Sequence, residues 1–283
     1  MAEFINLSSY RFVTLNGLPA LRSELEVVCR DAGLKGTILL SPEGINLFVA
    51  GSRAGVDRLL GDLRGRPGLH DLEAKESISD HAPFDHMRIK IKREIIAFGV
   101  EGIHPDRHTS PKLSARQLKQ WLDEGRPITL LDTRNEYEAR IGTFTGALRL
   151  GIDHFRDFPA AVRQLPESLK DQPVVMFCTG GIRCEKAGPL LEREGFRSVH
   201  QLEGGILRYF EQCGGAHYTG ECFVFDQRVG VGPDLLATGA VLCEACQMPV
   251  RKAEQVAPDY LAGNHCPSCV RDRPRAGLSS ASD

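Results

Sequence analysis

The chain is organised around one stretch, Val174-Val-Met-Phe-Cys-Thr-Gly-Gly-Ile-Arg-Cys-Glu-Lys-Ala187. Its first four residues are apolar and mostly β-branched or bulky, which is typical of a buried parallel strand. Paired glycines follow Cys178 at once, and a helical pattern resumes near Arg183. This order places Cys178 at the carboxyl end of a strand, where open α/β sheets bind their ligands. The sequence therefore predicts an α/β domain with Cys178 at its functional edge.

The loop after this strand predicts a reactive cysteine. Backbone N–H groups of the loop and of the following helix would converge on the Cys178 sulfur, and Arg183 adds a positive charge. Both favour the thiolate and so make Cys178 a nucleophile. The alternative is a structural cysteine, since free cysteine is among the most buried residue types. The predicted site consists of the catalytic residues Cys178 and Arg183 and of the loop residues Thr179, Gly180, Gly181, Ile182 and Cys184.

The size of the loop indicates what it surrounds. Four residues separate Cys178 from Arg183, and the loop resembles the active-site loop of the rhodanese family. Protein tyrosine phosphatases have five residues there, enough to wrap a phosphate. The shorter loop suits a sulfur-sized group, such as a persulfide on Cys178. Cys184 is either a small core residue or a resolving thiol for an oxidised Cys178.

Length, composition and charge bound the remaining possibilities. At 283 residues with 42% hydrophobic content, the chain is long enough for two ordinary domains and a small module. Its formal charge of −2 gives no global attraction to nucleic acid, so any polyanion site must be local. Nine cysteines, an odd number with two CxxC pairs, suit a reducing compartment. Without a signal peptide or an apolar run of about 18 residues, we expect a cytoplasmic protein with no membrane span and leave its oligomeric state open.

The first 100 residues predict an α+β domain. Apolar periodicity gives the order strand, helix, strand, strand, helix, strand, at residues 9–15, 18–32, 36–40, 45–49, 53–63 and 69–75. This order matches a ferredoxin-like or acylphosphatase-like sandwich, with two helices on an antiparallel sheet. Cys29 falls on the apolar face of its helix, and we interpret it as a core residue.

A basic segment follows at residues 84–98. Apolar residues alternate there with Arg88, Lys90 and Lys92, so a strand would bury one side and present cations on the other. We call these three residues the basic stripe. With Arg93 it predicts a phosphate-backbone contact surface for RNA. The alternative is an edge strand that uses lysine to discourage edge pairing.

The middle of the chain predicts alternating strands and helices. A turn-rich linker at residues 101–114 precedes a catalytic α/β domain at 115–230, whose first helix is capped by Ser114. Gly188-Pro189 interrupts the helix after the Cys178 loop, and a proline there costs about 3 kcal/mol if fully helical. We therefore expect a kink at that point.

Several further landmarks carry a resemblance to a known family. Asp132-Thr-Arg134 with Glu138, Gly146-Ala147, the Cys178 loop and Leu202-Glu-Gly-Gly-Ile206 are similar to the successive motifs of a rhodanese domain. With the N-terminal domain, residues 84–98 and Glu221-Cys-Phe-Val-Phe-Asp-Gln-Arg-Val229, they resemble the oxygen-dependent tRNA uridine hydroxylase family. The resemblance implies 5-hydroxyuridine formation at the tRNA wobble position, with molecular oxygen as co-substrate and Cys178 as the active cysteine.

Two other functions remain open on the sequence. The first is a sulfurtransferase that passes sulfane sulfur from thiosulfate or a persulfide to a thiol. The second is a noncatalytic RNA-binding adaptor, which the intact nucleophile loop disfavours. The sequence has no facial triad of two histidines and a carboxylate, no dinucleotide fingerprint and no flavin motif, so we predict no organic redox cofactor.

The last 50 residues predict a metal module. Cys243-Glu-Ala-Cys246 and Cys266-Pro-Ser-Cys269 are separated by 19 residues, the spacing of four-thiolate zinc sites. Four thiolates leave no open position, so we expect one structural zinc within residues 231–270. The alternative is four unliganded thiols, although about 40 residues without a core need such a staple. Residues 271–283 are basic and serine-rich, which predicts a disordered tail.

Overall fold

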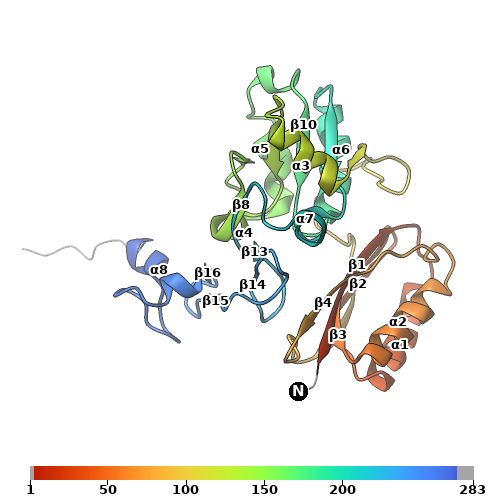
Figure 1. The fold of residues 1–283 in the computed structure, drawn as a ribbon. Helices are drawn as coiled ribbons and strands as arrows, with labels where there is room; N and C mark the ends of the chain where they lie inside the picture. Colours follow the sequence, from red (N-terminus) through yellow and green to blue (C-terminus); the bar gives the residue numbers. More distant parts are fainter. Residues whose placement is uncertain (1–2, 273–283) are drawn as a thin grey trace, which may run out of the picture.

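The computed structural model describes residues 3–272. It has three parts in chain order: an N-terminal α+β domain, a central α/β domain and a small C-terminal module (Figure 1). Most of the predicted tail, residues 273–283, lies outside the described residues. Arg271 and Asp272 are the last residues of helix α8 (Pro267–Asp272). The limits predicted for the domains stay predictions.

The N-terminal domain is a five-stranded sheet with two helices on one face (Figure 1). Its elements are β1 (Phe4–Phe12), α1 (Leu18–Asp31), β2 (Lys35–Ser41), β3 (Gly44–Gly51), α2 (Arg53–Arg64), β4 (Lys75–Ser79) and β5 (Met87–Ile91). The strand order is β4-β1-β3-β2-β5. The first four strands pair antiparallel, as predicted for a ferredoxin-like sandwich, but β5 is added at the edge parallel to β2. The sheet is therefore mixed rather than purely antiparallel.

Two predicted strands were misplaced. The first strand begins at Phe4 and ends at Phe12, not at residues 9–15. The fourth begins only at Lys75, because Leu69 and Leu72 lie in successive turns. Both leucines are buried against the helices, so their apolar character reflects core packing in a turn and not a strand. Cys29 is fully buried in the same core, in line with its prediction.

The two faces of this sheet have different neighbours. Side chains such as Leu7, Ile38 and Leu47 form the core with α1 and α2. Because successive strand residues point to opposite faces, Tyr10 and Phe48 belong to the face without helices. That open face looks towards the central domain, and it is the part of the N-terminal domain that reaches the predicted site.

The central domain is a parallel sheet between two layers of helices. Its elements are β6 (Lys112–Leu113), α3 (Ala115–Asp123), β7 (Thr129–Asp132), α4 (Glu136–Ile141), β8 (Gly142–Phe144), β9 (Leu148–Arg149), a 3-10 turn (Phe155–Asp157), α5 (Phe158–Val162), a 3-10 turn (Glu167–Leu169), β10 (Val174–Phe177), α6 (Ile182–Arg193), β11 (Val199–Leu202) and α7 (Gly205–Cys213). The strand order is β6-β11-β10-β7-β9, and all four pairings are parallel. Strand β10, predicted as a buried parallel strand, lies at its centre.

Strand β10 is apolar throughout because both of its faces are covered. Val174 and Met176 pack with residues of α5 and α6, whereas Val175 and Phe177 pack with residues of α3 and α7. Helix α3 begins with a capping box at Ser114, where the sequence predicted it. The central strand therefore holds the loop that follows it between two packed layers.

Helix α6 contains Pro189 and still spans Ile182–Arg193. The carbonyl of Glu185, which a helical amide at position 189 would have satisfied, accepts a hydrogen bond from the Thr109 hydroxyl at 3.4 Å. Gly188 leaves room for the linker to pack on the helix, since a Cβ there would lie 2.2 Å from the Ser110 Oγ atom. The linker thus packs on the glycine and satisfies the group that the proline leaves free; the kink itself stays a prediction.

The chain after α7 forms short strand pairs. Strand β12 (Tyr218–Gly220) pairs with β8, and β13 (Cys222–Phe223) forms a hairpin with β14 (Gly230–Val231). The segment at 221–229, one of the stretches that carry the family resemblance, therefore contains a turn. Strands β15 (Val241–Leu242) and β16 (Pro249–Val250), a 3-10 turn (Lys252–Glu254) and α8 form the C-terminal module. Within residues 3–272, no helix is long and apolar enough to cross a membrane.

Candidate active site

Cys178 lies directly after β10, and its side chain is 1% exposed. The Gly181 N–H donates to the Cys178 sulfur at 3.1 Å, and the Arg183 N–H is a second backbone donor. Gly181 has a φ of 103°, a left-handed conformation that glycine adopts readily, and α6 begins at the next residue. The loop and the first turn of α6 therefore surround the sulfur with amides, as the sequence predicted.

A second glycine segment closes the back of this loop. The Ile206 N–H donates to the Cys178 carbonyl at 2.9 Å. A Cβ on Gly205 would lie 2.4 Å from that same carbonyl oxygen. Only glycine permits this approach, which gives a physical reason for the Gly-Gly pair of the landmark at residues 202–206.

The surroundings of Cys178 favour its thiolate. Burial alone would raise the pKa of Cys178, but a hydrogen bond from the Cys184 thiol, the charge of Arg183 and the two loop amides outweigh it and lower the pKa to about 5. Burial and the neighbouring Cys178 raise the pKa of Cys184. The pair therefore holds one thiolate, on Cys178, and one thiol that donates to it.

Arg183 is buried in an ion pair. Its guanidinium donates twice to the Glu138 carboxylate, at 2.7 Å for the pair Nη2 and Oε1, and both side chains are buried. Part of the charge that the sequence assigned to anion stabilisation is therefore offset by Glu138. Glu138 Oε2 also accepts a hydrogen bond from the Asn135 N–H at the start of α4. The sequence singled out Glu138 as a landmark but did not reveal this pairing.

Asp132 and Arg134, the other acidic and basic landmarks, face each other and not the loop. Arg134 Nη2 donates to Asp132 Oδ2 at 2.6 Å and to the Gly142 carbonyl at 2.7 Å, and both charged side chains are fully buried. This pair fixes the turn after β7 to the start of β8. The Asp132–Arg134 pair therefore has a structural role.

Two residues of the N-terminal domain reach the Cys178 loop. The Lys75 ammonium group donates to the Gly180 carbonyl at 2.7 Å, and the Tyr10 hydroxyl donates to Glu185 at 3.1 Å. Both lie more than 100 residues before the loop in the chain, so no local pattern predicted them. The N-terminal sheet is therefore part of the site.

Lys186 joins the two domains next to the loop. It is 2% exposed and makes ion pairs with Glu43 at 2.9 Å and Glu94 at 2.8 Å. It also donates to the Ile96 carbonyl at 3.2 Å. Since removing one partner of a buried ion pair is costly, this cluster holds the open face of the sheet against α6.

A cavity of about 550 Å³ lies between the open face of the sheet and the loop, and we call it the Cys178 cavity. Five of the seven predicted loop residues line it: Cys178, Thr179, Gly180, Ile182 and Arg183. Its other walls include five aromatic rings, those of Tyr10, Phe48, Phe84, Phe155 and Phe225. Gly181 and Cys184 lie behind this surface. A thiolate at the wall of an aromatic cavity is suited to a flat, unsaturated substrate.

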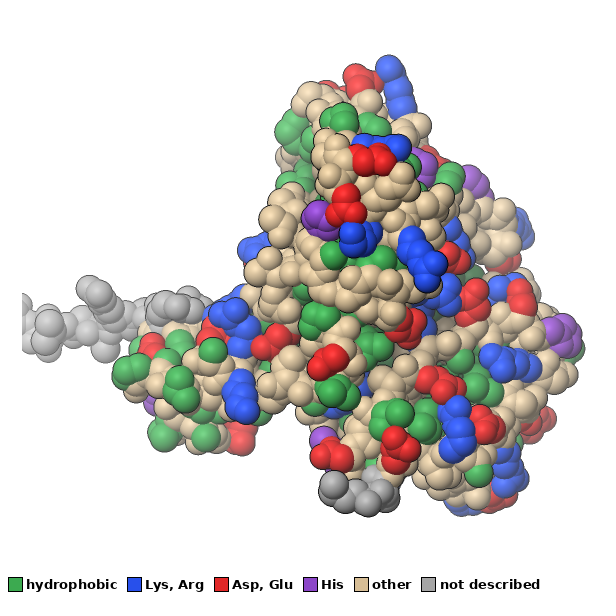
Figure 2. Space-filling view, viewed as in Figure 1, with side chains coloured by type: hydrophobic (Ala, Val, Ile, Leu, Met, Phe, Trp, Pro, Cys, Tyr) green, Lys and Arg blue, Asp and Glu red, His purple; other side chains and the backbone are tan. Residues whose placement is uncertain are grey.

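Two residues of the basic stripe, Arg88 and Lys90, lie on the edge strand β5, and Lys92 directly follows it. Ile89 is buried in the core while Arg88, Lys90, Lys92 and Arg93 are exposed, so the predicted alternation holds there. Ile91, which the pattern placed inside, is 39% exposed. Lys92 lines the Cys178 cavity, whereas Arg93 lies in the loop beyond. The position at a sheet edge fits both interpretations of the stripe, and on the face drawn in Figure 2 basic and acidic side chains are mixed.

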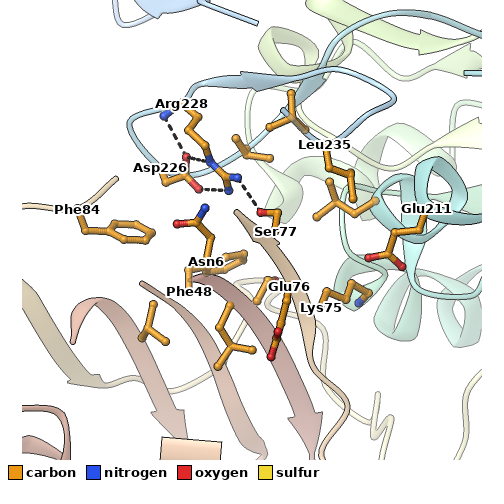
Figure 3. Close-up of a pocket in the computed structure, with 16 residues that line it drawn as sticks. Asn6, Phe48, Lys75, Glu76, Ser77, Phe84, Glu211, Asp226, Arg228 and Leu235 are labelled. Carbon is orange, nitrogen blue, oxygen red and sulfur yellow. Dashed lines mark hydrogen bonds and ion pairs between the residues drawn. The ribbon is translucent and has the colours of Figure 1, made fainter. Parts of the chain in front are cut away.

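The β13–β14 hairpin ties the end of the central domain to the N-terminal sheet. Arg228 forms a fork with Asp226, at 2.6 Å for Nη2 and Oδ2, and donates to the Ser77 Oγ atom on β4 at 2.7 Å (Figure 3). A small cavity of about 40 Å³ remains between these residues, Asn6 and Leu235. Cys222 is fully buried, and burial raises its pKa to about 12.

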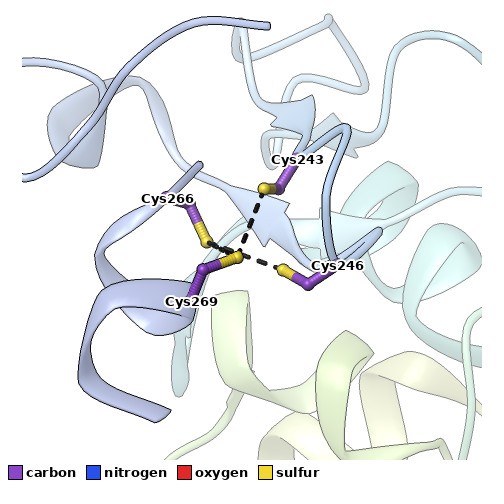
Figure 4. Close-up of side chains that lie close together, drawn as sticks. All are labelled: Cys243, Cys246, Cys266 and Cys269. Atoms are coloured by element: carbon purple, nitrogen blue, oxygen red, sulfur yellow. Dashed lines mark hydrogen bonds between the residues drawn. The ribbon is translucent and has the colours of Figure 1, made fainter. Parts of the chain in front are cut away.

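The four cysteines of the C-terminal module converge on one point (Figure 4). Their sulfurs lie within 4.8 Å of one another, and three of the pairs are 3.6, 3.7 and 3.8 Å apart. Zinc–sulfur bonds of about 2.3 Å would place the sulfurs of a regular tetrahedron about 3.8 Å apart. The residues present therefore fit a four-coordinate metal ion, and Cys243, Cys246, Cys266 and Cys269 could hold one.

The fold and the loop together define a rhodanese-like α/β domain joined to an acylphosphatase-like domain. A family model described as the UPF0176 acylphosphatase like domain matches residues 4–95, and one for the rhodanese-like domain matches residues 114–212. A solution structure of a rhodanese-like domain from Anabaena is 26% identical, covering 40% of this chain and 80% of that chain at a TM-score of 0.33. The two family-model matches confirm the predicted fold class.

Curated relatives extend the match to almost the whole chain. A tRNA uridine(34) hydroxylase from Cupriavidus necator is 44% identical over 97% of this chain and 99% of its own. Another of that name, from Burkholderia thailandensis, is 47% identical over 94% of this chain and 93% of its own. The chain belongs to the tRNA uridine(34) hydroxylase family.

Proposed function

We propose that the protein hydroxylates C5 of the wobble uridine of tRNA, forming 5-hydroxyuridine with molecular oxygen as co-substrate. The family supports the reaction, since its members at 44–47% identity carry that name. The observation that carries the proposal for this chain is the Cys178 thiolate in the wall of an aromatic cavity of about 550 Å³. A nucleobase turned out of its stack needs such a pocket.

The chemistry begins with addition of the Cys178 sulfur to C6 of the uracil. The new S–C6 bond moves the C5–C6 π pair towards O4, so that C5 becomes an enolate-like carbon able to attack molecular oxygen. The resulting peroxide takes up a proton to become a hydroperoxide. Two thiols then reduce it as they form a disulfide, supplying two electrons and two protons, so that one oxygen atom leaves as water and the other stays on C5. Loss of the C5 proton and of the sulfur from C6 then restores the ring, with a hydroxyl group on C5.

The residues around Cys178 supply what the first step needs. The loop amides and the Cys184 thiol keep the sulfur ionised, so it attacks without a general base. Arg183 adds charge stabilisation that Glu138 partly offsets. The aromatic walls exclude water and stack on the base, while Lys92 at the cavity and the rest of the basic stripe contact phosphates.

The other parts have supporting roles in this proposal. Residues 1–100 and 115–230 form the two walls of the cavity, linked by 101–114, and residues 231–270 are a module closed by one structural zinc. The zinc assignment rests on the all-sulfur donor set and its spacing. We place the enzyme in the cytoplasm, where tRNA is available.

Mass spectrometry of tRNA nucleosides tests the function. Cells that lack the protein should lose 5-hydroxyuridine, and the wild-type chain should restore it. The purified protein should form it on transcribed tRNA only when oxygen and a thiol are present. Restoration by a Cys178→Ala chain would refute the proposed role of the sulfur. Sulfurtransfer from thiosulfate is measured in parallel, because activity there without hydroxylation would favour the sulfurtransferase instead.

A further inference from the structure

A second hollow adjoins the Cys178 cavity. It is an open groove of about 550 Å³, and three of its lining residues, Thr37, Phe84 and Phe225, also line the Cys178 cavity. Its other lining residues include Arg88 and, from strand β15, Val241 and Leu242. We call it the Phe225 groove. Because they share these walls, the two hollows adjoin each other.

Phe225 stands between the two hollows. Its side chain belongs to the β13–β14 hairpin and is 46% exposed, although it is a large apolar residue. Its ring lies 6.2 Å from that of Phe48 and 5.9 Å from the Arg183 guanidinium. Phe223 meets it edge to face at 5.2 Å. One side of an otherwise supported ring is therefore left open, which suits stacking on a base.

The hairpin that carries Phe225 is held in place at several points. Arg228 donates to Ser77, and Gln227 donates to Asp85 at 3.0 Å. Val229 has a φ of 59°, rare for a β-branched residue, and the Gly230 N–H spans it to the Arg228 carbonyl at 2.6 Å. Strained turns of this kind persist where the surrounding structure fixes them, often at binding sites. The open face of Phe225 is thus presented by a rigid element.

The charges along these hollows favour an anionic chain. Arg88 lines the groove and Lys92 lines the Cys178 cavity, and the two lie four residues apart, about 13 Å along an extended segment. Arg88 pairs in register with Thr37, one of the shared walls. Of the acidic residues of the groove, Asp226 pairs with Arg228, while Asp85 accepts a hydrogen bond from Gln227 and keeps its charge. Arg88 and Lys92 are therefore cations spaced along two adjoining hollows with aromatic walls.

We propose that the Phe225 groove binds an unpaired nucleotide adjacent to the target uridine, with its base stacked on Phe225 and its phosphate at Arg88. This inference rests on the proposed function for the identity of the target, and it adds a binding site for a neighbour. Single-stranded nucleic acid is recognised by aromatic stacking and backbone cations in this way. The groove therefore selects for a loop nucleotide in a single-stranded context.

Binding measurements on a non-turning-over protein test the groove. In a Cys178→Ser background, fluorescence anisotropy compares a five-nucleotide RNA with a central uridine and the same RNA with abasic flanking positions. Phe225→Ala should weaken binding of the intact RNA about tenfold more than binding of the abasic RNA, because both lose a wall of the Cys178 cavity but only the intact RNA also loses a stacked neighbouring base. Arg88→Gln should lower the log–log salt slope for both RNAs by about 0.7.

Matched controls separate the groove from general effects. Leu236→Ala removes another exposed apolar side chain, and Arg58→Gln removes an exposed cation on α2; neither should change binding. Equal loss for both RNAs on Phe225→Ala, or no loss for either, would overturn the inference. The nucleoside analysis is independent of this assay. Absence of 5-hydroxyuridine with an intact Phe225 effect would refute the proposed reaction and leave the groove standing.

Discussion

The molecule has two clusters of cysteines with opposite surroundings. At the Cys178 loop, two sulfurs differ in ionisation because amides and Arg183 favour a thiolate on one of them only. That sulfur borders a cavity of about 550 Å³. In the C-terminal module, four sulfurs face one another within 4.8 Å. The first arrangement leaves one sulfur open to a substrate, and the second directs all four sulfurs to a common centre.

The difference shows that a cysteine's function is set by what its sulfur faces. Cys178 is almost fully buried, as is Cys266, with 1% exposure each. Burial therefore does not distinguish the two clusters. Amide donors and an adjoining cavity mark a nucleophile, whereas neighbouring sulfurs at about tetrahedral spacing mark a metal site.

The sharpest test of the loop cluster is substitution of its two cysteines in turn. Cys178→Ser should abolish hydroxylation and any sulfurtransfer, a loss of at least about 100-fold, because a serine hydroxyl is hardly ionised at neutral pH. Cys184→Ser should retain partial activity. Both variants should bind tRNA like the wild type, and product is measured by nucleoside mass spectrometry. An active Cys178→Ser with a dead Cys184→Ser would show that the nucleophile is misassigned.

For the second cluster, we expect about one zinc per chain by elemental analysis. Replacing Cys243 or Cys269 with serine should release it, because each substitution removes one of the four ligands. Structural zinc contributes about 10 kcal/mol or more to such modules. The central domain should stay folded by circular dichroism, because the four ligands lie outside it. The matched substitution Cys213→Ser, a cysteine outside both clusters, should keep the metal. Zinc retained by a chain lacking all four ligands contradicts the assignment.

The buried ion pair behind Cys178 predicts a large effect on stability. Glu138→Gln leaves the buried Arg183 charge without its partner, and the free energy of unfolding should fall by about 3–5 kcal/mol in urea titrations. The exposed pair Arg22–Glu26 is the control, and Glu26→Gln should change it by no more than about 0.5 kcal/mol. Equal effects of the two substitutions would mean that Arg183 is not buried as a paired charge.

The ionisation of Cys178 is tested by the pH dependence of its alkylation. With a pKa lowered to about 5, Cys178 is a thiolate from pH 6 upwards, so its rate with iodoacetamide should be flat from pH 6 to 8 and fall below pH 5. The thiolate fraction of an ordinary cysteine rises steeply from pH 6 to 8. At pH 7 it is only about 3%, roughly 30-fold less than the thiolate fraction expected for Cys178. Peptide mapping separates Cys178 from Cys213, the internal control. A rate that rises tenfold per pH unit between 6 and 8 refutes the lowered pKa.

The smallest expected effect is a change in the salt dependence of tRNA binding, which shows whether RNA binds beside the Cys178 loop or at the metal module. Replacing Arg88, Lys90 and Lys92 with Gln should weaken tRNA binding and lower the log–log salt slope by roughly 0.7 to 0.9 per lost contact. Replacing Arg251 and Lys252 of the module with Gln should leave the slope unchanged. An unchanged slope in the stripe variant would leave the stripe as an edge-strand device. A change in the module variant alone would point to an adaptor that binds RNA through its metal module.

Local patterns predicted the elements best where the chain is strongly periodic. The apolar run of β10, the Ser114 cap and the face of α1 that carries Leu25 and Cys29 all lie where the sequence placed them. The predictions were wrong where buried apolar residues lie in turns, as at Leu69 and Leu72. The CxxC spacing also predicted the module, because each CxxC places its own two sulfurs close together, and the structure then brings the two pairs to one point.

The sequence by itself determined the class of both cysteine clusters, since a strand–loop–helix and two CxxC turns are built from neighbouring residues. Tertiary structure alone decided that Glu138 pairs with Arg183, that Lys75 contacts the loop, and that Phe225 separates two hollows. The contacts of Glu138 with Arg183 and of Lys75 with Gly180 join residues 45 and 105 positions apart, so they depend on how whole elements pack. The spacing of residues along the chain carries no signal for such contacts, because their distances are set by the packing of elements within the central domain and by the packing of the two domains against each other.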